Sequence, residues 1–314
     1  MSEFTGLITN FLVNGKFSTI TLSYSLSNIN ALDDLNKKVR INPVERMVID
    51  LRDPDNYPAK DDGKWGWSQG CGAGGGYVYN IIKGYTDSSA STGYCKILKI
   101  DPSDWSIVKR SGDLEIGHGA SLTYNSNYPN SPILITRGDG ADTDNLFWLN
   151  TNMEIKSTTT TPTCSGLHWS GSGFYLIPRS GSLDFAFYEP SSSPPAPPPG
   201  NYNLTNVEPT DIGATPAAAD CIGDLCVFCR SIVPKNLIGT GLDFTNVFLE
   251  VFKKSGTSAT LIRRLPLPSL PSDHYDTVET VEPEAIFFLN NKLYYTASDW
   301  YYCYIYELEI WTAD

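Results

Sequence analysis

The sequence predicts an all-β fold, and three observations support this. Aromatic residues make up 12 % of the 314 residues, with 18 Tyr and 13 Phe, and such side chains suit pleated, half-buried strands. The chain also holds 26 Gly and 21 Pro, which supply turns. Finally, a turn, an apolar strand, a short polar turn and a second apolar strand recur along the chain. We therefore predict a five-bladed β-propeller of four-stranded antiparallel blades, preceded by a short N-terminal arm.

The recurring phrase gives the number of blades. Its equivalent points are spaced by 47, 49, 51 and 67 residues, and they are Gly70, Gly117, Gly166, Ala217 and Glu284. The long last interval contains a proline-rich loop at 266–271. Periods near 50 with four strands each are typical of propeller blades, whereas stacked helix pairs would show helical periodicity.

The later strands of each unit follow the same pattern. One alternating set is Val247, Leu249 and Val251, set against Phe248, Glu250 and Phe252. Near the end of the chain Tyr304, Tyr306, Leu308 and Ile310 alternate with Ile305, Glu307, Glu309 and Trp311. Strict alternation with period two is the signature of a strand.

The first 45 residues differ from the repeats. Ile20, Leu22, Tyr24 and Leu26 alternate with Thr and Ser, which predicts a strand. We expect Asn30 to cap a short helix with acidic residues in its first turn. We therefore place an arm of one strand and a short helix at 1–45 and the propeller at 46–314. The arm's strand either closes the ring or docks onto a neighbouring protein.

Charge and hydropathy exclude several functions. The formal net charge is −12, the opposite of what a phosphate backbone attracts, so we expect no nucleic-acid partner. No run approaches the roughly 18 apolar residues of a membrane span. The start, Met1-Ser2-Glu3-Phe4, lacks the basic and apolar regions of a secretory signal. We expect neither membrane insertion nor a signal peptide.

The seven cysteines do not form a recognisable metal site. Cys226 and Cys229 stand three apart in a strand-like run, and residues three apart on a strand point to opposite faces. No second closely spaced pair completes a four-ligand site. We favour free, buried cysteines in a reducing cytosol, with disulfides or a metal as alternatives, and we predict no metal and no cofactor.

Two blade starts resemble a known family. They read Gly117-His118-Gly119-x-x-Leu122-Thr123-Tyr124-Asn125 and Val281-Glu282-Pro283-Glu284-x-Ile286, the latter followed by Asn291-Lys292-Leu293-Tyr294. Residues 65–311 resemble the five-bladed platform domain in tail receptor-binding proteins of phages that infect Gram-positive bacteria. The seven cysteines depart from that pattern.

The resemblance implies a function and partners. It implies a virion tail or fibre-tip component, made in the host cytoplasm, that recognises a host cell-surface polysaccharide. It also implies a homo-oligomer, usually a trimer, that contacts other tail or virion proteins.

Polar residues at the blade starts are expected to converge at one mouth of the central channel. This channel-mouth cluster consists of His118, His168, Arg137, Arg179, Glu282 and Glu284. One interpretation is a polar pocket for a sugar, with acid and base groups. The other is a hydrogen-bonded plug that fixes the blades, and we favour it.

Catalysis is the less favoured interpretation. Glycoside hydrolysis needs two carboxylates about 5–9.5 Å apart. Glu282 and Glu284 stand about 7 Å apart on one strand, but neighbours on one strand rarely flank a sugar from both sides. Asp139 or Asp142 from another blade would be a better second carboxylate. The alternatives to a glycan binder are thus a glycan-active hydrolase or lyase, or a structural assembly protein without a ligand.

Exposed aromatic residues give a candidate glycan site, because sugar C–H faces stack on rings. Trp300, Tyr301 and Tyr302 follow Ser298-Asp299 in an apparent loop between strands. We predict that this loop is the glycan-binding site. The remaining Trp residues are expected mainly in blade packing.

Overall fold

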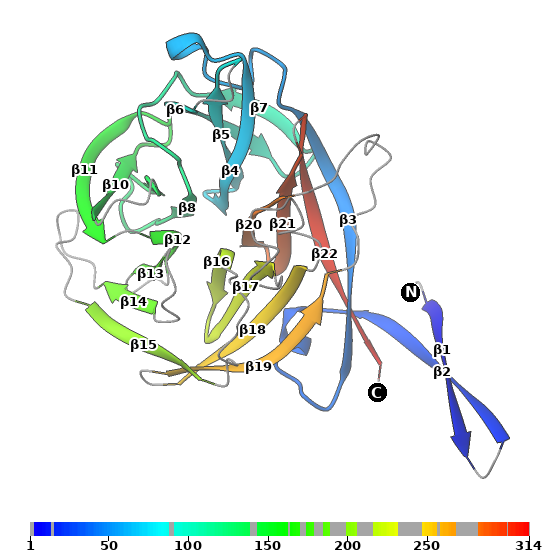
Figure 1. Ribbon diagram of the computed structural model, residues 1–314. Coiled ribbons are helices and arrows are strands. Elements are labelled where there is room, and N and C mark those ends of the chain that lie inside the picture. The colour runs from blue at the N-terminus through cyan, green and yellow to red at the C-terminus, as the bar shows by residue number, and fades with distance from the viewer. Residues whose placement is uncertain are drawn as a thin grey trace.

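The computed structural model describes residues 3–13, 16–87, 91–138, 143–162, 164–169, 174–178, 185–188, 199–205, 216–231, 247–255, 258–267, 282–299 and 301–313. Side chains are described for fewer residues, and those of residues 1–23, 160–218 and 282 are among the side chains that are not described. The described segments form an all-β propeller of four-stranded antiparallel blades, arranged as a ring around a central axis (Figure 1).

The described strands form four sheets. One is the antiparallel blade β4 (Trp65–Gly74), β5 (Tyr77–Tyr85), β6 (Ser91–Asp101) and β7 (Ser106–Arg110). The next is β8 (Ser121–Tyr124), β9 (Ile133–Thr136), β10 (Thr143–Leu149) and β11 (Ile155–Pro162). In both blades the first strand lies nearest the axis (Figure 1).

The third sheet has eight strands in two antiparallel runs. The first run is β12 (Cys164–Trp169), β13 (Phe174–Pro178), β14 (Phe185–Tyr188) and β15 (Pro199–Thr205). The second is β16 (Pro216–Ile222), β17 (Leu225–Ser231), β18 (Val247–Ser255) and β19 (Ser258–Pro266). A short parallel pairing between β15 and β19 joins the two runs.

The fourth sheet joins the two ends of the chain. Its strands are β20 (Glu282–Leu289), β21 (Lys292–Ser298), β22 (Tyr302–Ala313), β2 (Lys16–Ser27) and β1 (Glu3–Val13), and β3 (Lys38–Asp50) also pairs with β22. The antiparallel β3–β22 register runs from Tyr302↔Asp50 to Ala313↔Lys38. The chain's beginning thereby supplies the outer strand of its last blade. The boundary that we predicted at 45–46 falls inside β3.

The arm is a two-stranded hairpin. β1 pairs with β2, and among the described residues β2 pairs with the propeller through Ser25, Leu26 and Ser27, whose partners are Thr312, Trp311 and Ile310. The hairpin projects away from the ring (Figure 1).

The short helix after β2 starts earlier than predicted. It is a 3₁₀ turn, η1 (Ile29–Leu32), and the side chain of Asn28 accepts the backbone N–H of Asn30. The predicted cap at Asn30 is therefore wrong, and no acidic residue lies in the first turn. A second 3₁₀ turn, η2 (Lys60–Asp62), precedes β4. No helix among the described residues is long and apolar enough to cross a bilayer.

The apolar core lies between neighbouring blades. Its largest cluster joins the last blade to β3, β5 and β17 and includes the fully buried Tyr304 and Tyr306, whose rings stack at 6.1 Å. A second cluster joins β5 and β6 to β8, β9 and β10. Aromatic residues thus pack the blades against each other, as the composition predicts.

The glycine-rich start of the first blade has a packing function. A Cβ atom on Gly72 would lie 2.5 Å from the carbonyl oxygen of Leu122 on β8, and one on Gly70 would lie 2.7 Å from the Cα of Ser121. β4 and β8 approach this closely only because β4 has no side chains there.

The preference for free cysteines is wrong for one pair. Cys221 and Cys226 form a disulfide between the facing residues of the β16–β17 hairpin, with their Cα atoms 4.1 Å apart. Cys71, Cys95, Cys229 and Cys303 are free and buried, as predicted. Burial raises the pKa of the Cys71 thiol well above its usual value and that of Cys303 to about 12, so both stay protonated at neutral pH.

Candidate functional site

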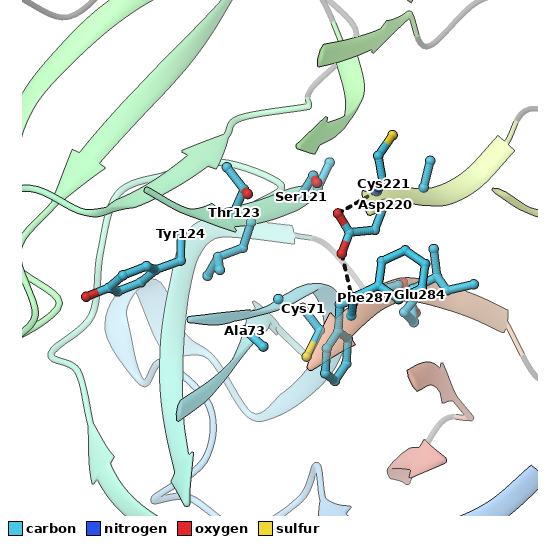
Figure 2. Close-up of a pocket in the computed structure, with 16 residues that line it drawn as sticks. Cys71, Ala73, Ser121, Thr123, Tyr124, Asp220, Cys221, Glu284 and Phe287 are labelled. Atoms are coloured by element: carbon cyan, nitrogen blue, oxygen red, sulfur yellow. Dashed lines mark hydrogen bonds between the residues drawn. The ribbon is translucent and has the colours of Figure 1, made fainter. Parts of the chain in front are cut away.

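A central cavity of about 190 Å³ lies where four first strands meet (Figure 2). It is lined by residues of β4, β8, β16 and β20, and the polar side chains in its wall include those of Ser121, Thr123, Asp220 and Glu284. Residues from the first strands of four strand runs thus face one cavity.

Asp220 joins two blades at this cavity. Its carboxylate accepts the backbone N–H of Phe288 on β20 at 2.8 Å through one oxygen, and the backbone N–H of Cys221 at 2.8 Å through the other (Figure 2). These two bonds fix the direction of the carboxylate. The residue therefore holds β16 against β20.

Glu284 makes a second join between blades. It is buried, with 7 % of its surface exposed, and lies at an irregularity in the β20–β21 register. One carboxylate oxygen accepts the indole N–H of Trp67 at 2.6 Å and the hydroxyl of Ser298 at 2.5 Å. Trp67 lies on β4 and Ser298 ends β21, so this carboxylate links the last blade to the first.

The other members of the channel-mouth cluster fall into two groups. Some lie away from the cavity, and for the others the side chain or the whole residue is not described. His118 precedes β8, and its Nδ1 lies 2.8 Å from the Nζ of Lys83 on β5. Arg137 follows β9 and is exposed. Neither lines the cavity, whereas Glu284 does. The side chains of His168 on β12 and Glu282 on β20 are not described, and Arg179, Asp139 and Asp142 lie outside the described residues.

The predicted glycan loop is built on a buried carboxylate. Asp299 is 1 % exposed, and one of its oxygens accepts the backbone N–H groups of Tyr301 and Tyr302, each at 2.6 Å. Its other oxygen accepts the hydroxyl of Tyr304 at 2.8 Å. The loop is also joined to the end of β3, because Leu51 donates its N–H to the carbonyl of Tyr301 at 2.8 Å. The buried carboxylate therefore fixes the backbone at Tyr301 and Tyr302.

The loop presents a tyrosine to solvent beside an arginine. Tyr301 is 47 % exposed. The guanidinium carbon of Arg52 lies 5.0 Å from the ring centre of Tyr301 and 4.9 Å from that of Tyr302, and the guanidinium donates to the Tyr302 hydroxyl at 2.7 Å. We call Asp50, Arg52, Tyr301 and Tyr302 the Arg–Tyr platform. Trp300 lies outside the described residues.

Asp50 orients the arginine. Its two oxygens each accept one N–H of the Arg52 guanidinium at 3.0 Å, and one also accepts the Arg52 backbone N–H at 2.9 Å. The guanidinium lowers the pKa of Asp50, and Asp50 in turn raises the pKa of Arg52. Both groups are therefore charged at neutral pH, and about half of each side chain remains exposed to a ligand.

Sequence reasoning missed Asp50 and Arg52. Asp50 ends β3 and Arg52 lies two residues after it, and the β3–β22 pairing places both beside a loop about 250 residues later. The one available signal was a charged turn, Asp50-Leu51-Arg52-Asp53, directly after an apolar run.

Most other aromatic candidates pack inside the blades. Trp148 is 1 % exposed, Trp105 tilts against Tyr294 at 5.4 Å, and Trp65 stacks on Tyr85 at 4.8 Å. These contacts agree with the expectation that most Trp residues serve blade packing. The described residues include no group of three or more His, Cys, Asp or Glu side chains that could hold a metal ion.

No family model and no curated protein matches the sequence. Similar solved structures include a GH43_1 enzyme from Xanthomonas citri, with 8 % identity, 85 % of this chain and 90 % of that chain covered, and a TM-score of 0.45. Another is the native arabinanase Arb43A of Bacillus subtilis, with 12 % identity, 77 % and 94 % covered, and a TM-score of 0.38.

A third similar structure is the β-propeller domain of the trilobed protease from Pyrococcus furiosus, with 8 % identity, 79 % and 83 % covered, and a TM-score of 0.35. At these TM-scores the likeness carries no argument about what this chain binds or does. The strand order of this chain, with four-stranded antiparallel runs, is what identifies it as a propeller.

Proposed function

We propose that this propeller recognises a glycan through the Arg–Tyr platform. The observation that supports the proposal is the exposed ring of Tyr301, held in place by Asp299 and flanked by the charged Arg52–Asp50 pair. An aromatic face accepts the C–H side of a sugar ring, and the neighbouring charged groups can donate to and accept from its hydroxyls.

The platform is pre-organised for binding. Tyr301 is fixed through its backbone N–H and its carbonyl, and Arg52 is fixed by Asp50 and by Tyr302. A ligand therefore pays little ordering entropy on the protein side, which favours affinity for a weakly binding partner such as a sugar.

The proposal extends to the virion. The blade-start resemblance supports a tail or fibre-tip component that recognises a host cell-surface polysaccharide as a trimer. Under this proposal the propeller has five blades. The eight-stranded sheet then counts as two blades, divided at the parallel β15–β19 pairing. Electron microscopy of particles that contain the protein tests the virion assignment directly.

Glycan cleavage at the central cavity is the second candidate. Two carboxylates, Asp220 and Glu284, lie in the wall of one cavity, and glycoside hydrolysis uses a pair of carboxylates. Both are held by donors from the protein itself, including Phe288 N–H and Trp67 N–H. These bonds favour a structural function, so we place binding ahead of cleavage.

The test of binding uses two platform variants and a matched control. Tyr301→Ala and Arg52→Ala are expected to abolish retention on immobilised cell-wall polysaccharides and signals on a glycan array, with little change in melting temperature. The control is Tyr77→Ala, because Lys99 lies 3.7 Å over the Tyr77 ring in an equivalent cation–π pair elsewhere on the propeller. Loss of binding in the control alone, or retention in both platform variants, would contradict the proposal.

The test of cleavage uses the cavity. If the wild-type protein shortens any polysaccharide that it retains, and Asp220→Asn or Glu284→Gln stops the shortening while retention persists, the protein is an enzyme and the second candidate is correct. Unchanged polymer length after incubation with the wild-type protein supports the binding function.

A further inference from the structure

A second cavity, of about 480 Å³, lies apart from the central one. Three segments line it, namely the η1 segment at 28–33, the β16–β17 turn at 222–225 and the β20–β21 turn through Asn291. Pockets that bind small molecules usually have volumes of about 300–1,000 Å³, so this one is large enough for a ligand. Its lining shares no residue with the central cavity or with the Arg–Tyr platform.

Two of the three walls are tied to the propeller by contacts of their own. The guanidinium of Arg263 on β19 donates to three backbone carbonyls of residues 32–37 at 2.7–3.2 Å, which holds the η1 segment against that strand. The β16–β17 turn lies between Cys221 and Cys226, so their disulfide closes the hairpin directly behind the part that lines the cavity.

The polar side chains of the lining have hydrogen-bonding capacity left for a ligand. Among the described residues, no hydrogen bond uses the side-chain amide of Asn30 or Asn291, or the carboxylate of Asp224. All three residues are exposed. Asp33, in contrast, accepts from the ammonium of Lys253 at 2.5 Å. The cavity therefore offers two amides and one carboxylate.

These groups fit a ligand that is rich in hydroxyls. An amide both donates and accepts hydrogen bonds and a carboxylate accepts them, and a hydroxyl can pair with either because it donates and accepts. An ammonium only donates, so it would leave the amide N–H groups unmatched. An anion would face the Asp224 carboxylate, and no Lys or Arg is among the described residues that line the cavity.

The remaining lining is apolar. Ile29 and Leu225 are buried and belong to the core cluster that joins the last blade to β3, β5 and β17, and the half-buried Ile222 packs against the same cluster. A sugar ring carries hydroxyls at its edge and C–H groups on its faces. It therefore matches a cavity that combines amide and carboxylate groups with an aliphatic surface.

We propose that this cavity is a separate sugar site, which binds a free mono- or disaccharide. It lies at the other end of β21 from the Arg–Tyr platform, because Asn291 directly precedes this strand and Ser298 ends it. With a rise of about 3.3 Å per residue, the two sites are roughly 20 Å apart. One sugar unit cannot contact both, so this site does not depend on what the platform binds.

Saturation-transfer NMR of the full-length protein tests the proposal, with glucose, galactose, mannose, rhamnose and N-acetylglucosamine as probes. The Tyr301→Ala variant is used, so that the platform does not contribute. At least one sugar is expected to receive saturation from the protein, with a dissociation constant of about 1 mM for a ligand of this size. Such weak binding is lost in the washes of a glycan array, so it is compatible with the loss of array signal in Tyr301→Ala.

Two cavity variants and a matched control locate the binding. Asn30→Ala and Asp224→Ala, each added to Tyr301→Ala, are expected to weaken binding about tenfold, since each removes a hydrogen-bonding group from the cavity. Asn36→Ala removes an exposed amide from the same part of the chain outside the cavity and is expected to change nothing. All three positions are exposed, so the melting temperature should stay unchanged.

Four results would overturn the proposal. The wild type alone might bind the sugars and Tyr301→Ala none, which would assign all sugar binding to the platform. Neither protein binding any of the five sugars would reject the cavity, while polysaccharide retention would still judge the platform. Equal weakening by Asn36→Ala and Asn30→Ala would place the sugar elsewhere. Binding of spermidine, inorganic phosphate or calcium in place of a sugar, with loss in Asp224→Ala, would assign the cavity to another ligand class.

Discussion

Trp67 and Glu284 connect the first blade to the last, because the indole N–H donates to the carboxylate at 2.6 Å between residues 217 positions apart. Asp220 makes the corresponding connection between β16 and β20 through Phe288 N–H. Polar groups at the blade starts thus hold neighbouring blades together. The plug interpretation of the channel-mouth cluster stays a prediction, and the contacts of Glu284 fit it.

The first prediction concerns this connection. Trp67→Phe removes the N–H donor to the buried Glu284 carboxylate and is expected to lower the free energy of unfolding by about 1–3 kcal/mol. Urea denaturation measures the change. Trp105→Phe is the control, because it replaces an indole by the same smaller ring at a half-buried residue that packs on Tyr294. Equal losses in the two variants would mean that ring size, not the hydrogen bond, matters.

The sequence predicted the blades because alternation and repeat spacing are local signals. It did not predict that β3 closes the last blade, because nothing near Lys38–Asp50 shows that its partner is β22, more than 250 residues later. The Arg–Tyr platform depends on that long-range pairing, so only its tyrosines could be predicted.

The disulfide was predictable in principle. Ile222 pairs with Leu225, which leaves Gly223-Asp224 as a two-residue turn and sets Cys221 opposite Cys226. Gly-Asp between two apolar runs is a recognised hairpin signal. The sequence analysis considered only the spacing of Cys226 and Cys229 along one strand. The disulfide instead joins Cys226 to Cys221 on the neighbouring strand.

The second prediction concerns this disulfide. The closed loop is short, with a sequence separation of 5, so the chain-entropy estimate gives about 2 kcal/mol of stabilisation. Cys221→Ser with Cys226→Ser is expected to lower the free energy of unfolding by that amount. Cys229→Ser, at a free buried cysteine on β17, serves as the comparison. Peptide mass mapping without reduction should show a linked Cys221–Cys226 peptide, and alkylation of both thiols in the native protein would contradict the structure.

The third prediction concerns acid stability. The Glu307 carboxylate is desolvated by burial, but Lys292 at 2.7 Å and Arg46 at 2.9 Å outweigh this effect and lower its pKa below the ordinary 4.5. Because the folded-state pKa lies below the unfolded value, the stabilisation is present above about pH 4.5. It is lost as the pH falls through the folded-state pKa.

Glu307→Gln tests this pH dependence. The variant is expected to be less stable than the wild type at pH 7 and to approach it as the pH drops below about 4. Melting temperatures between pH 3 and pH 7 measure the difference. Glu115→Gln, at an exposed position, should track the wild type throughout. A constant difference between Glu307→Gln and the wild type at every pH would show that the ion pairs do not contribute.

The last prediction links the hydrogen-bonded position of Tyr301 to binding. Asp299 accepts three donors, Tyr301 N–H, Tyr302 N–H and the Tyr304 hydroxyl, and it is 1 % exposed. Asp299→Ala leaves these donors unpaired and frees Tyr301 to adopt other conformations. Affinity for the retained glycan is then expected to fall about tenfold or more, which corresponds to about 1.4 kcal/mol.

Asp299→Asn separates conformation from charge. The amide oxygen can still accept both backbone N–H groups, and its nitrogen can donate to the Tyr304 hydroxyl if that hydroxyl turns to accept. This variant is therefore expected to retain most of the glycan affinity, measured by calorimetry beside Asp299→Ala and Tyr301→Ala. If Asp299→Ala lowers the melting temperature but binds as the wild type does, the tyrosine does not need its fixed position. If Asp299→Asn loses as much affinity as Asp299→Ala, the negative charge itself, rather than the loop that it organises, supports binding.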